Sequence, residues 1–486
     1  MTFKDTRAKW LALYVVCLGD LMIVLDGTIV NVALPSIRDD LGFSQTSLAW
    51  VVNAYLLTFG GFLLLGGRLG DLFGHRRLFL AGITLFTIAS LACGLATSQE
   101  MLVAARAVQG IGGAVVSAVA FSLLVTIFTE ASDRAKAMGV FGFVLSGGGV
   151  IGVLAGGLLT DLLNWHWIFL VNIPVGIAVY ALSLRLLPAG KGPAAQGRVD
   201  VAGAITVTAS LMLAVYAIIN GNEEGWLSTP TLGLLGISAV LLAAFVAIEA
   251  KVSSPLMPLG LFRNRNVTTA NVLGVLMAAG MFAYFFFSAL YLQLVLEYTP
   301  MEVGLAYLPG TIVWGASSLL LSDRLVMKLG IRKPLLGGLT LMTLALLLLA
   351  RTPVDGNWAI DILPATVLVG LGAGVAFNPL LLAAMNGVAP EQAGLASGVV
   401  NTAFMMGGAV GLAALVSIAD SRTESVLASG GAQLVSLNSG YHLAFIVGAI
   451  FVIASAAVGA ALLRVEKPQH AHGEAPNAVP AAAEAH

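Results

Sequence analysis

The chain is a series of long apolar runs separated by short segments that are polar or contain glycine and proline. A helix needs about 20 apolar residues to cross the hydrocarbon core of a bilayer. Fourteen runs reach or approach that length, at residues 10–34, 46–66, 78–97, 101–128, 135–160, 165–187, 200–219, 231–249, 267–296, 303–322, 334–350, 360–385, 393–419 and 441–463. The runs lack the period-two alternation of membrane strands. The pattern therefore predicts an all-α integral membrane protein with fourteen transmembrane helices.

Composition supports a lipid environment for these helices. Hydrophobic residues make up 58% of the chain and charged residues 10%, whereas soluble domains carry about 25% charged residues. With a net charge of −1, the chain has no excess of positive charge that would attract nucleic acid. Cys17 and Cys93 both lie in apolar runs, so we expect buried small side chains rather than a disulfide or a metal site. The basic segment 1–10 leads into an apolar run without a cleavage site, which predicts an uncleaved first helix.

The distribution of cations predicts the orientation. With the N-terminus in the cytoplasm, twenty of the 24 Lys and Arg residues lie on cytoplasmic segments. The outer loops hold only Arg38, Arg351 and Arg422, and Arg106 lies inside a helix. Because cytoplasmic loops are enriched in Lys and Arg, we expect a multi-pass protein of the cell membrane with both termini in the cytoplasm. The tail 465–486, rich in Ala, Pro and His, is expected to be disordered there.

Two cytoplasmic loops indicate an internal repeat. Residues 69–77 are LGDLFGHRR and residues 325–333 are LVMKLGIRK, so each ends in a glycine, one spacer residue and two cations. Gly74 and Gly330 are 256 residues apart. We expect two pseudo-symmetric six-helix bundles with two helices inserted between them, an arrangement typical of alternating access around a central cavity. The predicted boundaries are 1–190 for the first bundle, 191–262 for the inserted helices and 263–464 for the second bundle.

Six segments carry motifs in the same order as a known family. They are LDGTIVNVALP at 25–35, GRLGDLFGHRR at 67–77, RAVQGIGGA at 106–114, WHWIFLVNIPVG at 165–176, the pair 291–293 and 304–309, and GVVNT at 398–402. Together they resemble the major facilitator superfamily, and specifically its fourteen-helix drug:proton antiporter branch. The resemblance implies a monomeric bacterial inner-membrane exporter of small molecules, driven by a proton gradient and without a cofactor.

The match departs from the family pattern at two positions. His166 stands where arginine is usual, and Val153 stands where the fifth-helix antiporter motif has proline. The missing proline removes a kink. The glycine frame of that motif is retained at Gly148, Gly152, Gly156 and Gly157. We interpret these glycines as sites of close helix packing, with a hinge as a further role.

Asp26 and Arg106 are the charged residues expected to carry the chemistry. A carboxylate in the bilayer costs at least a few kcal/mol, so intramembrane acids usually face a cavity and have a function. Burial disfavours the charged form of an acid and a nearby cation favours it, so such a group can take up a proton on one side and release it on the other. Helices one and four are neighbours in the resembled fold, which makes Asp26 the expected partner of Arg106. The resemblance assigns proton coupling to Asp26; a purely structural tie is the alternative for both residues.

Asp20 is a second acid on the first helix. Its spacing from Asp26 places the two about 120° apart around the helix and about 9 Å apart along it, so they need not share a proton. Asp20 could hold a cationic substrate, relay protons or pair near the cytoplasmic end, and the spacing does not decide between these roles. Asp20, Gly27 and Asn31 form one stripe that we expect to line the cavity.

The loop after the second helix is expected to act as a conformational latch. In the resembled family its acid, Asp71 here, holds the two bundles together in the outward-facing state through arginine partners and a helix N-terminus. The other members of this predicted latch are Gly67, Gly74, Arg76 and Arg77. A helix cap on a solvated loop is the alternative. Met327 occupies the equivalent position in the second copy, so the latch would be one-sided.

The second bundle is expected to supply the substrate wall. The repeat offset maps Asp26 to Phe282, and the interiors of helices nine and ten hold no charge. Amide and aromatic groups suit an apolar substrate with a few hydrogen-bonding atoms. The candidates in this bundle are Asn271, Phe282, Tyr284, Phe286, Gln293, Asn378 and Asn401, and Asn31 of the first helix is a further candidate for the substrate cavity. For each aromatic residue, lipid contact or core packing is an equally good interpretation.

These features predict proton-coupled efflux of small apolar or monocationic compounds. No GxxxxGK[ST] run is present, so we expect an ion gradient rather than ATP to drive transport. Export or import of one specific metabolite is the first alternative. A membrane enzyme or sensor is disfavoured because the sequence has no HExxH motif and no paired Cys/His ligands.

Overall fold

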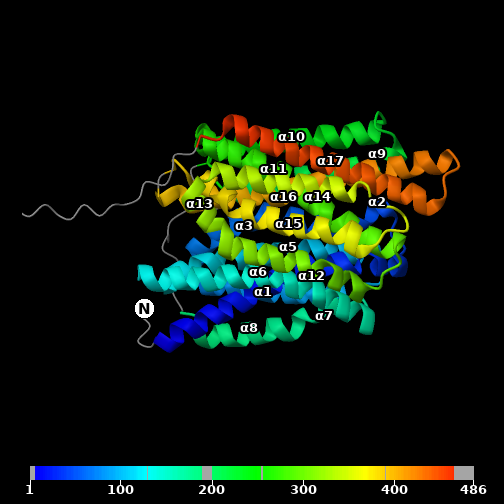
Figure 1. The fold of residues 1–486 in the computed structure, drawn as a ribbon. Helices are drawn as coiled ribbons and strands as arrows, with labels where there is room; N and C mark the ends of the chain where they lie inside the picture. Colours follow the sequence, from blue (N-terminus) through cyan, green and yellow to red (C-terminus); the bar gives the residue numbers. More distant parts are fainter. Residues whose placement is uncertain (1–5, 129, 189–199, 253–254, 389, 465–486) are drawn as a thin grey trace, which may run out of the picture.

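The computed structural model describes residues 6–128, 130–188, 200–252, 255–388 and 390–464 (Figure 1). The predicted disordered tail lies outside these ranges. Within them the regular structure is helical throughout. The elements are α1 (Thr6–Leu41), α2 (Gln45–Leu48), α3 (Trp50–Phe73), α4 (His75–Gly94), α5 (Gln99–Ile127), α6 (Ala131–Leu162), α7 (Trp167–Leu170), α8 (Asn172–Leu186), α9 (Val201–Glu224), α10 (Thr229–Lys251), η1 (Leu259–Arg263), α11 (Arg265–Leu290), η2 (Tyr291–Val295), α12 (Pro300–Ser317), η3 (Ser318–Ser322), α13 (Asp323–Leu329), α14 (Arg332–Leu349), η4 (Trp358–Ile362), α15 (Leu363–Met385), α16 (Pro390–Ala428) and α17 (Gln433–Leu462).

The fourteen predicted membrane helices are confirmed. Thirteen helical segments of the described chain are long and apolar enough to cross a bilayer. The remaining predicted run, 135–160, lies within the continuous 32-residue helix α6. Helices satisfy their backbone hydrogen bonds internally, which is what a chain in lipid requires. Hydroxyl caps begin several of them: Ser98 starts α5 and Thr299 starts α12 with a capping box.

Two six-helix groups pack in the same way. In the first, α1 packs on α6 and α5 packs on both α3 and α4. In the second, α11 packs on α16 and α15 packs on both α12 and α14. The loop glycines of the two copies, Gly74 and Gly330, have φ of 95° and 78° and end α3 and α13. Glycine adopts this region of φ without strain.

A matched pair of arginine contacts follows the same repeat. Arg76 donates to the carbonyl of Leu184 near the end of α8, and Arg332 donates to the carbonyl of Ala460 near the end of α17. Cations are favoured at helix C-termini, where carbonyl groups are left without a partner. The two arginines are separated by the same 256 residues as the loop glycines. The predicted fold of two similar bundles with two inserted helices is therefore present.

The two bundles meet along two helix pairs. In the first, α6 packs on α12, and in the second, α3 packs on α16. The inserted helix α9 packs against both α3 and α16, whereas α10 packs mainly on α9 and lies at the edge of the molecule (Figure 1). The predicted boundaries at residues 190 and 262 remain predictions.

Helix α6 presents glycines to both bundles. A Cβ on Gly148 would lie 3.0 Å from the Val24 side chain of α1, and one on Gly156 would lie 2.7 Å from the Ile29 carbonyl of α1. Gly152 packs between these two positions on the same face of α6, against α1. Gly157 instead approaches α12, where its Cβ would lie 2.6 Å from the carbonyl of Pro300. Such contacts allow helix backbones to approach closely.

Candidate functional site

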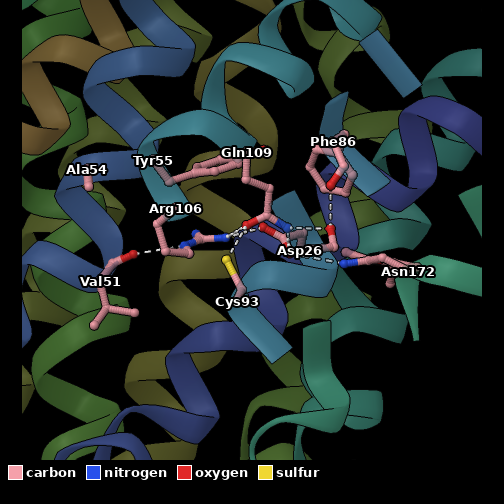
Figure 2. Close-up of polar contacts among 12 residues, drawn as sticks. Asp26, Val51, Ala54, Tyr55, Phe86, Cys93, Arg106, Gln109 and Asn172 are labelled. Carbon is pink, nitrogen blue, oxygen red and sulfur yellow. Dashed lines mark hydrogen bonds and ion pairs between the residues drawn. The ribbon is translucent and has the colours of Figure 1, made fainter. Parts of the chain in front are cut away.

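Helices α1, α3, α4, α5 and α8 of the first bundle contribute to a buried polar cluster, shown in Figure 2. At its centre, Arg106 of α5 forms an ion pair with Asp26 of α1. Their side chains are 1% and 0% exposed. The pairing that the sequence predicted is therefore present in the structure. Charges in such surroundings are tolerated only when they are paired and hydrogen-bonded.

Three side chains donate to the Asp26 carboxylate. Arg106 Nη1 donates to Oδ2, while Gln109 Nε2 and Asn172 Nδ2 donate to Oδ1 at 2.7 and 3.2 Å. Gln109 lies one helical turn after Arg106 on α5, and Asn172 begins α8. Asp26 thus ties α1 to both α5 and α8.

Arg106 is held by more than its counter-charge. Its Nε donates to the Val51 carbonyl of α3 at 3.0 Å, and Nη1 donates to Gln109 Oε1 at 2.6 Å. The guanidinium carbon lies 4.3 Å from the Tyr55 ring centroid and 5.6 Å from that of Phe169. Aromatic faces attract cations, and the attraction grows when both are desolvated.

Gln109 extends the cluster to α4. Its Nε2 also donates to Ser90 Oγ at 2.8 Å, and the Cys93 thiol donates to its Oε1 at 3.6 Å. Ser90 in turn donates to the Phe86 carbonyl at 2.7 Å. The Gln109 amide therefore uses both of its N–H donors and accepts two hydrogen bonds. Such a network fixes the orientation of every member.

Glycines of α5 bring the surrounding helices into contact with this cluster. A Cβ on Gly110 would lie 2.5 Å from the Tyr55 carbonyl of α3. One on Gly112 would lie 2.7 Å from the Phe86 backbone nitrogen of α4. Larger residues at either position would push α3 or α4 away, so these glycines set the spacing that lets Val51 and Ser90 reach the cluster.

Two polar side chains of α3 lack hydrogen-bond partners among the described residues. The hydroxyl of Tyr55 and the amide atoms of Asn53, both on α3, are buried without a donor or acceptor among the described residues. Unpaired buried polar groups are uncommon and call for an explanation. Both residues lie within one turn of Val51, whose carbonyl accepts the Arg106 bond.

Asp20 occupies a separate site on the same helix. Ser117 of α5 donates to its Oδ1, and the Asp20 side chain is buried. The two acids of α1 therefore have different partners on α5. Gly27 follows the two acids along α1 and precedes Asn31. A Cβ on Gly27 would meet no atom within 4 Å. The Asn31 amide instead donates to the Gly27 and Thr28 carbonyls of its own helix.

Comparison with known proteins identifies the family. The family model described as Major Facilitator Superfamily matches residues 16–412. The chain belongs to the major facilitator superfamily. It is 38% identical over 454 residues to the puromycin resistance protein pur8 of Streptomyces alboniger, covering 92% of this chain and 90% of that one. It is also 38% identical over 455 residues to the cephamycin export protein CmcT of Amycolatopsis lactamdurans, covering 93% and 92%.

A third relative and two solved structures agree with this assignment. The multidrug resistance protein Stp of Mycobacterium tuberculosis is 37% identical over 417 residues, covering 85% of this chain and 76% of that one. The nucleoside transporter NupG superposes with a TM-score of 0.67 at 12% identity, covering 93% and 100% of the two chains. A bacterial homologue of the human lysosomal transporter Spinster gives 0.66 at 15%, covering 94% and 97%. These structures share the fold, and the sequence relatives place this transporter among the antibiotic and drug resistance exporters with fourteen helices.

The predicted substrate residues of this transporter do not gather in one place. Asn271 and Gln293 lie near opposite ends of the continuous segment formed by α11 and η2. Asn271 bonds to the Val267 carbonyl of its own helix and lines a shallow pocket of about 240 Å³. Gln293 instead donates to the Val32 carbonyl of α1 at 2.8 Å, across the two bundles.

The aromatic candidates pack within the second bundle. The Tyr284 ring lies 5.9 Å from that of Tyr307, and Phe286 packs on Phe287 at 5.3 Å. The Phe282 ring lies 6.2 Å from that of Phe404 on α16. The other two amide candidates are half-buried: Asn378 donates to Ser318 Oγ at 3.4 Å, and Asn401 lies on α16. Their contact with a substrate remains a prediction.

The predicted latch also remains a prediction. Arg76 bonds to α8 of its own bundle, and Arg77 lines a groove of about 470 Å³ with residues of α4 and α8. Gly67 has no atom within 4 Å of a Cβ position, and Gly74 separates α3 from α4. The side chain of Asp71 lies outside the described part of the structure.

Sequence reasoning missed the neutral members of the cluster. Gln109 and Asn172 lie inside the motifs RAVQGIGGA and WHWIFLVNIPVG, in which Arg106 was the one residue with a predicted role. The signal that could have found them is a large amide within an otherwise apolar span. Such a group needs partners in a low-dielectric interior.

Proposed function

We propose that this transporter expels small apolar or monocationic compounds in exchange for protons, with Asp26 as the proton carrier. The observation that carries the proposal is the fully buried Asp26 carboxylate, held by Arg106 and two amide groups. The names of its relatives support the direction and the kind of cargo. They include proteins of puromycin resistance, cephamycin export and lincomycin resistance.

Protonation would change the energetics of the cluster. With Asp26 ionised, its charge and that of Arg106 cancel. With Asp26 protonated, the guanidinium is left as an uncompensated buried cation, which is costly. The protonated site would therefore favour a rearrangement that gives Arg106 other partners or water. A ligand that binds one conformation better shifts the equilibrium toward it, and here the ligand is the proton.

The cluster has a structural route to the interface between the bundles. Arg106 binds the Val51 carbonyl of α3, and α3 packs on α16 of the second bundle. The same α3 carries the unpartnered polar groups of Asn53 and Tyr55. We propose that these groups exchange hydrogen bonds as Arg106 moves, so that protonation at α1 alters the packing of α3.

A second set of contacts closes one end of the molecule. Gln293 of η2 binds the Val32 carbonyl of α1, and Gly157 of α6 touches Pro300 of α12. In the predicted orientation these contacts lie on the outer side. Export would require these contacts to open so that substrate can leave and protons can enter from the outer side. They therefore form the proposed outer gate.

Proteoliposomes with an imposed pH gradient test the proposal. We expect the wild-type protein to move dyes and antibiotics of varied chemistry against their gradients, and Asp26→Asn to lose this proton-driven movement. Because the amide keeps the shape of the cluster, Asp26→Asn should still exchange labelled substrate for unlabelled substrate. Asp39→Asn, whose side chain is 66% exposed, is the matched control. Unchanged proton-driven efflux and unchanged pH sensitivity in Asp26→Asn would overturn the proposal.

The same assay distinguishes a multidrug pump from a transporter of a single metabolite. Transport of one compound class, with no competition from unrelated dyes or antibiotics, would favour a specific exporter. Accumulation inside vesicles in symport with protons would favour an importer. Mutual competition among unlike compounds is the result expected for a multidrug pump.

A further inference from the structure

The two inserted helices bring together a second pair of buried acids. Asp200 immediately precedes α9, and Glu249 lies in the last turn of α10. The helices pack against each other, so residues 49 positions apart in the chain become neighbours. Their side chains are 5% and 3% exposed. Fully buried acids without a cation are rare because burial disfavours their charged forms.

Each acid uses one oxygen to bind the backbone. Asp200 Oδ1 accepts a hydrogen bond from the Gly203 amide at 2.7 Å, and Glu249 Oε2 accepts one from the Met257 amide at 3.0 Å. The other oxygens, Asp200 Oδ2 and Glu249 Oε1, are buried and receive no N–H or O–H group from the described residues. The backbone bonds fix both carboxyl groups in place.

The two unpartnered oxygens face the same small space beside Gly203. A Cβ built on Gly203 would lie 2.5 Å from Asp200 Oδ2 and 2.9 Å from Glu249 Oε1. These distances bring the two carboxyl groups close together, with no donor from the described residues between them. Two ionised carboxylates cannot bond to each other because neither has a hydrogen to donate. One shared proton completes the arrangement.

Among the described residues, no cation takes the place of that proton. Leu65 of α3, Ala204 of α9 and Leu256 form an apolar cluster at this end of the hairpin. Lys251 and Arg68, the nearest cations along α10 and α3, have exposed side chains and make no ion pair with either acid. Among the described charged groups, Asp200 is the one that acts on Glu249. The side chains of Asp71 and Arg198 lie outside the described part of the structure.

We propose that Asp200 and Glu249 form a second proton-binding site, separate from Asp26, that holds one proton between two carboxyl groups. Loss of the proton leaves two negative charges in an apolar site, and their repulsion separates the base of α9 from α10. Interacting acids of this kind titrate as a pair. The site does not depend on the proton carrier proposed above.

The position of this pair gives it access to the transport machinery. Helix α9 packs against α3 and α16, which form one of the two helix pairs along which the bundles meet. A shift of α9 would therefore change the interface that must move during alternating access. In the predicted orientation the pair lies at the cytoplasmic ends of α9 and α10, so its occupancy would follow cytoplasmic pH.

Infrared difference spectroscopy of the full-length protein, recorded between acidic and alkaline pH, tests the shared proton. A protonated carboxyl group gives a C=O stretch that is distinct from the ionised form and shifts in heavy water. We expect one such band to disappear at alkaline pH in the wild type and in Asp26→Asn. It should be absent at every pH in Asp200→Asn and Glu249→Gln. Glu224→Gln, an exposed acid on α9, is the matched control and should keep the band.

The substitutions are chosen to preserve the fold. The amide of Asp200→Asn can donate to Glu249 Oε1 and so imitates the protonated pair. We expect transport by the wild type to decline at alkaline cytoplasmic pH. Transport by Asp200→Asn should not show this decline. If a single variant fails to fold, the double variant Asp200→Asn with Glu249→Gln keeps a neutral hydrogen-bonded pair for the same measurements.

Three results would overturn the proposal. The first is that Asp200→Asn and Glu249→Gln keep every protonated-carboxyl band of the wild type. The second is a pH profile of transport identical in Asp200→Asn and wild type, which would leave the pair a purely structural contact. The third is a wild-type spectrum that changes with added Na⁺ or K⁺ at constant pH, which would assign the site to a metal cation.

Discussion

At the scale of single residues, the cluster around Asp26 shows how a membrane protein tolerates a buried charge. Each oxygen of the carboxylate has a donor, and the guanidinium of Arg106 contacts a carboxylate, an amide, a carbonyl and an aromatic face. Replacing a buried ion pair as a whole is often tolerated, whereas removing one partner typically costs about 3–5 kcal/mol. The pair should therefore behave as a unit.

Arg106→Met tests this unit. We expect it to lower the thermal stability of the purified protein, because it leaves the Asp26 carboxylate buried without a counter-charge. Adding Asp26→Asn to Arg106→Met should restore much of the loss, although the double variant will not couple transport to protons. Thermal unfolding in detergent is the measurement. Additive losses in the double variant would mean that the two charges do not stabilise each other.

Gln109→Leu tests the neutral part of the cluster. It removes one donor to Asp26 and one acceptor from Arg106, and a hydrogen bond to a charged group contributes about 1.5–3 kcal/mol. Because fewer hydrogen bonds would then hold Asp26 and Arg106 in place, the dependence of efflux on pH should change. The pH profile of proteoliposome efflux measures this. Gln433→Leu, at an exposed position on α17, should leave the profile unchanged, and a matching profile in Gln109→Leu would contradict the proposed role.

The sequence predicted the charged residues of this cluster but not the neutral ones. Asp26 and Arg106 could be paired because each is too costly to leave alone in lipid, so the candidates were few. The side-chain amides of Gln109 and Asn172 could find hydrogen-bond partners in many ways. Only the packing of α5 and α8 decides which partners they meet. Asn271 illustrates the same limit, since its amide bonds within its own helix rather than facing a shared cavity.

At the scale of elements, α6 is a helix of the first bundle that packs on helices of both bundles. Gly148, Gly152 and Gly156 lie four residues apart and form one face against α1, whereas Gly157 lies on another face against α12. Val153 adds to the second contact, since its carbonyl lies 3.0 Å from a Cβ position on Gly304. The glycines keep their packing role although the family proline is absent, and α6 continues through this region as one helix.

Gly157→Val tests the contact between the bundles. The side chain would overlap the backbone of Pro300 and Met301, so α6 and α12 must separate. We expect transport to fall at least tenfold while the first bundle remains folded, because the α1 face of α6 is untouched. Gly149→Ala is the control: a Cβ there meets no atom within 4 Å, so stability should change by less than about 1 kcal/mol. The measurements are efflux and thermal unfolding, and normal efflux in Gly157→Val would rule out a close α6–α12 contact during the cycle.

Hydropathy does not predict where the membrane helices end. The fourteen apolar runs located every membrane helix, yet α1 continues through Pro35 to Leu41 and α16 extends to Ala428. Polar residues at these ends leave the hydrocarbon core but remain helical, so the hydropathy pattern cannot mark them. Helix packing faces were also hidden, because a helix that is apolar all round gives no amphipathic signal.

At the scale of the whole molecule, the outer gate is a small set of contacts between two large bundles. Gln293 is the side chain that links η2 to the backbone of α1 there. One hydrogen bond contributes about 1 kcal/mol, which is enough to shift a conformational equilibrium severalfold.

Gln293→Leu should therefore shift the transporter toward an open outer side. Spin labels on cysteines introduced at the exposed positions Asp39 and Glu297 would report the distance between the ends of α1 and α11. The native Cys17 and Cys93 are both buried, as predicted, and need not be removed. We expect a larger share of long distances in Gln293→Leu than in wild type. An unchanged distance distribution would show that the bond does not contribute to closure.

Among the described residues of the two bundles, the buried charged side chains lie in the first bundle alone. The first bundle holds Asp26 and Arg106, whereas the second has Phe282 at the repeat position of Asp26 and an aromatic interior. A scaffold divided in this way would let cargo preference evolve in one half while the energy source stays intact in the other. Chimeras that join the first half of this chain to the second half of a relative would then inherit the relative's spectrum of antibiotics. Such modularity would explain how proteins named for puromycin, cephamycin and lincomycin share one architecture.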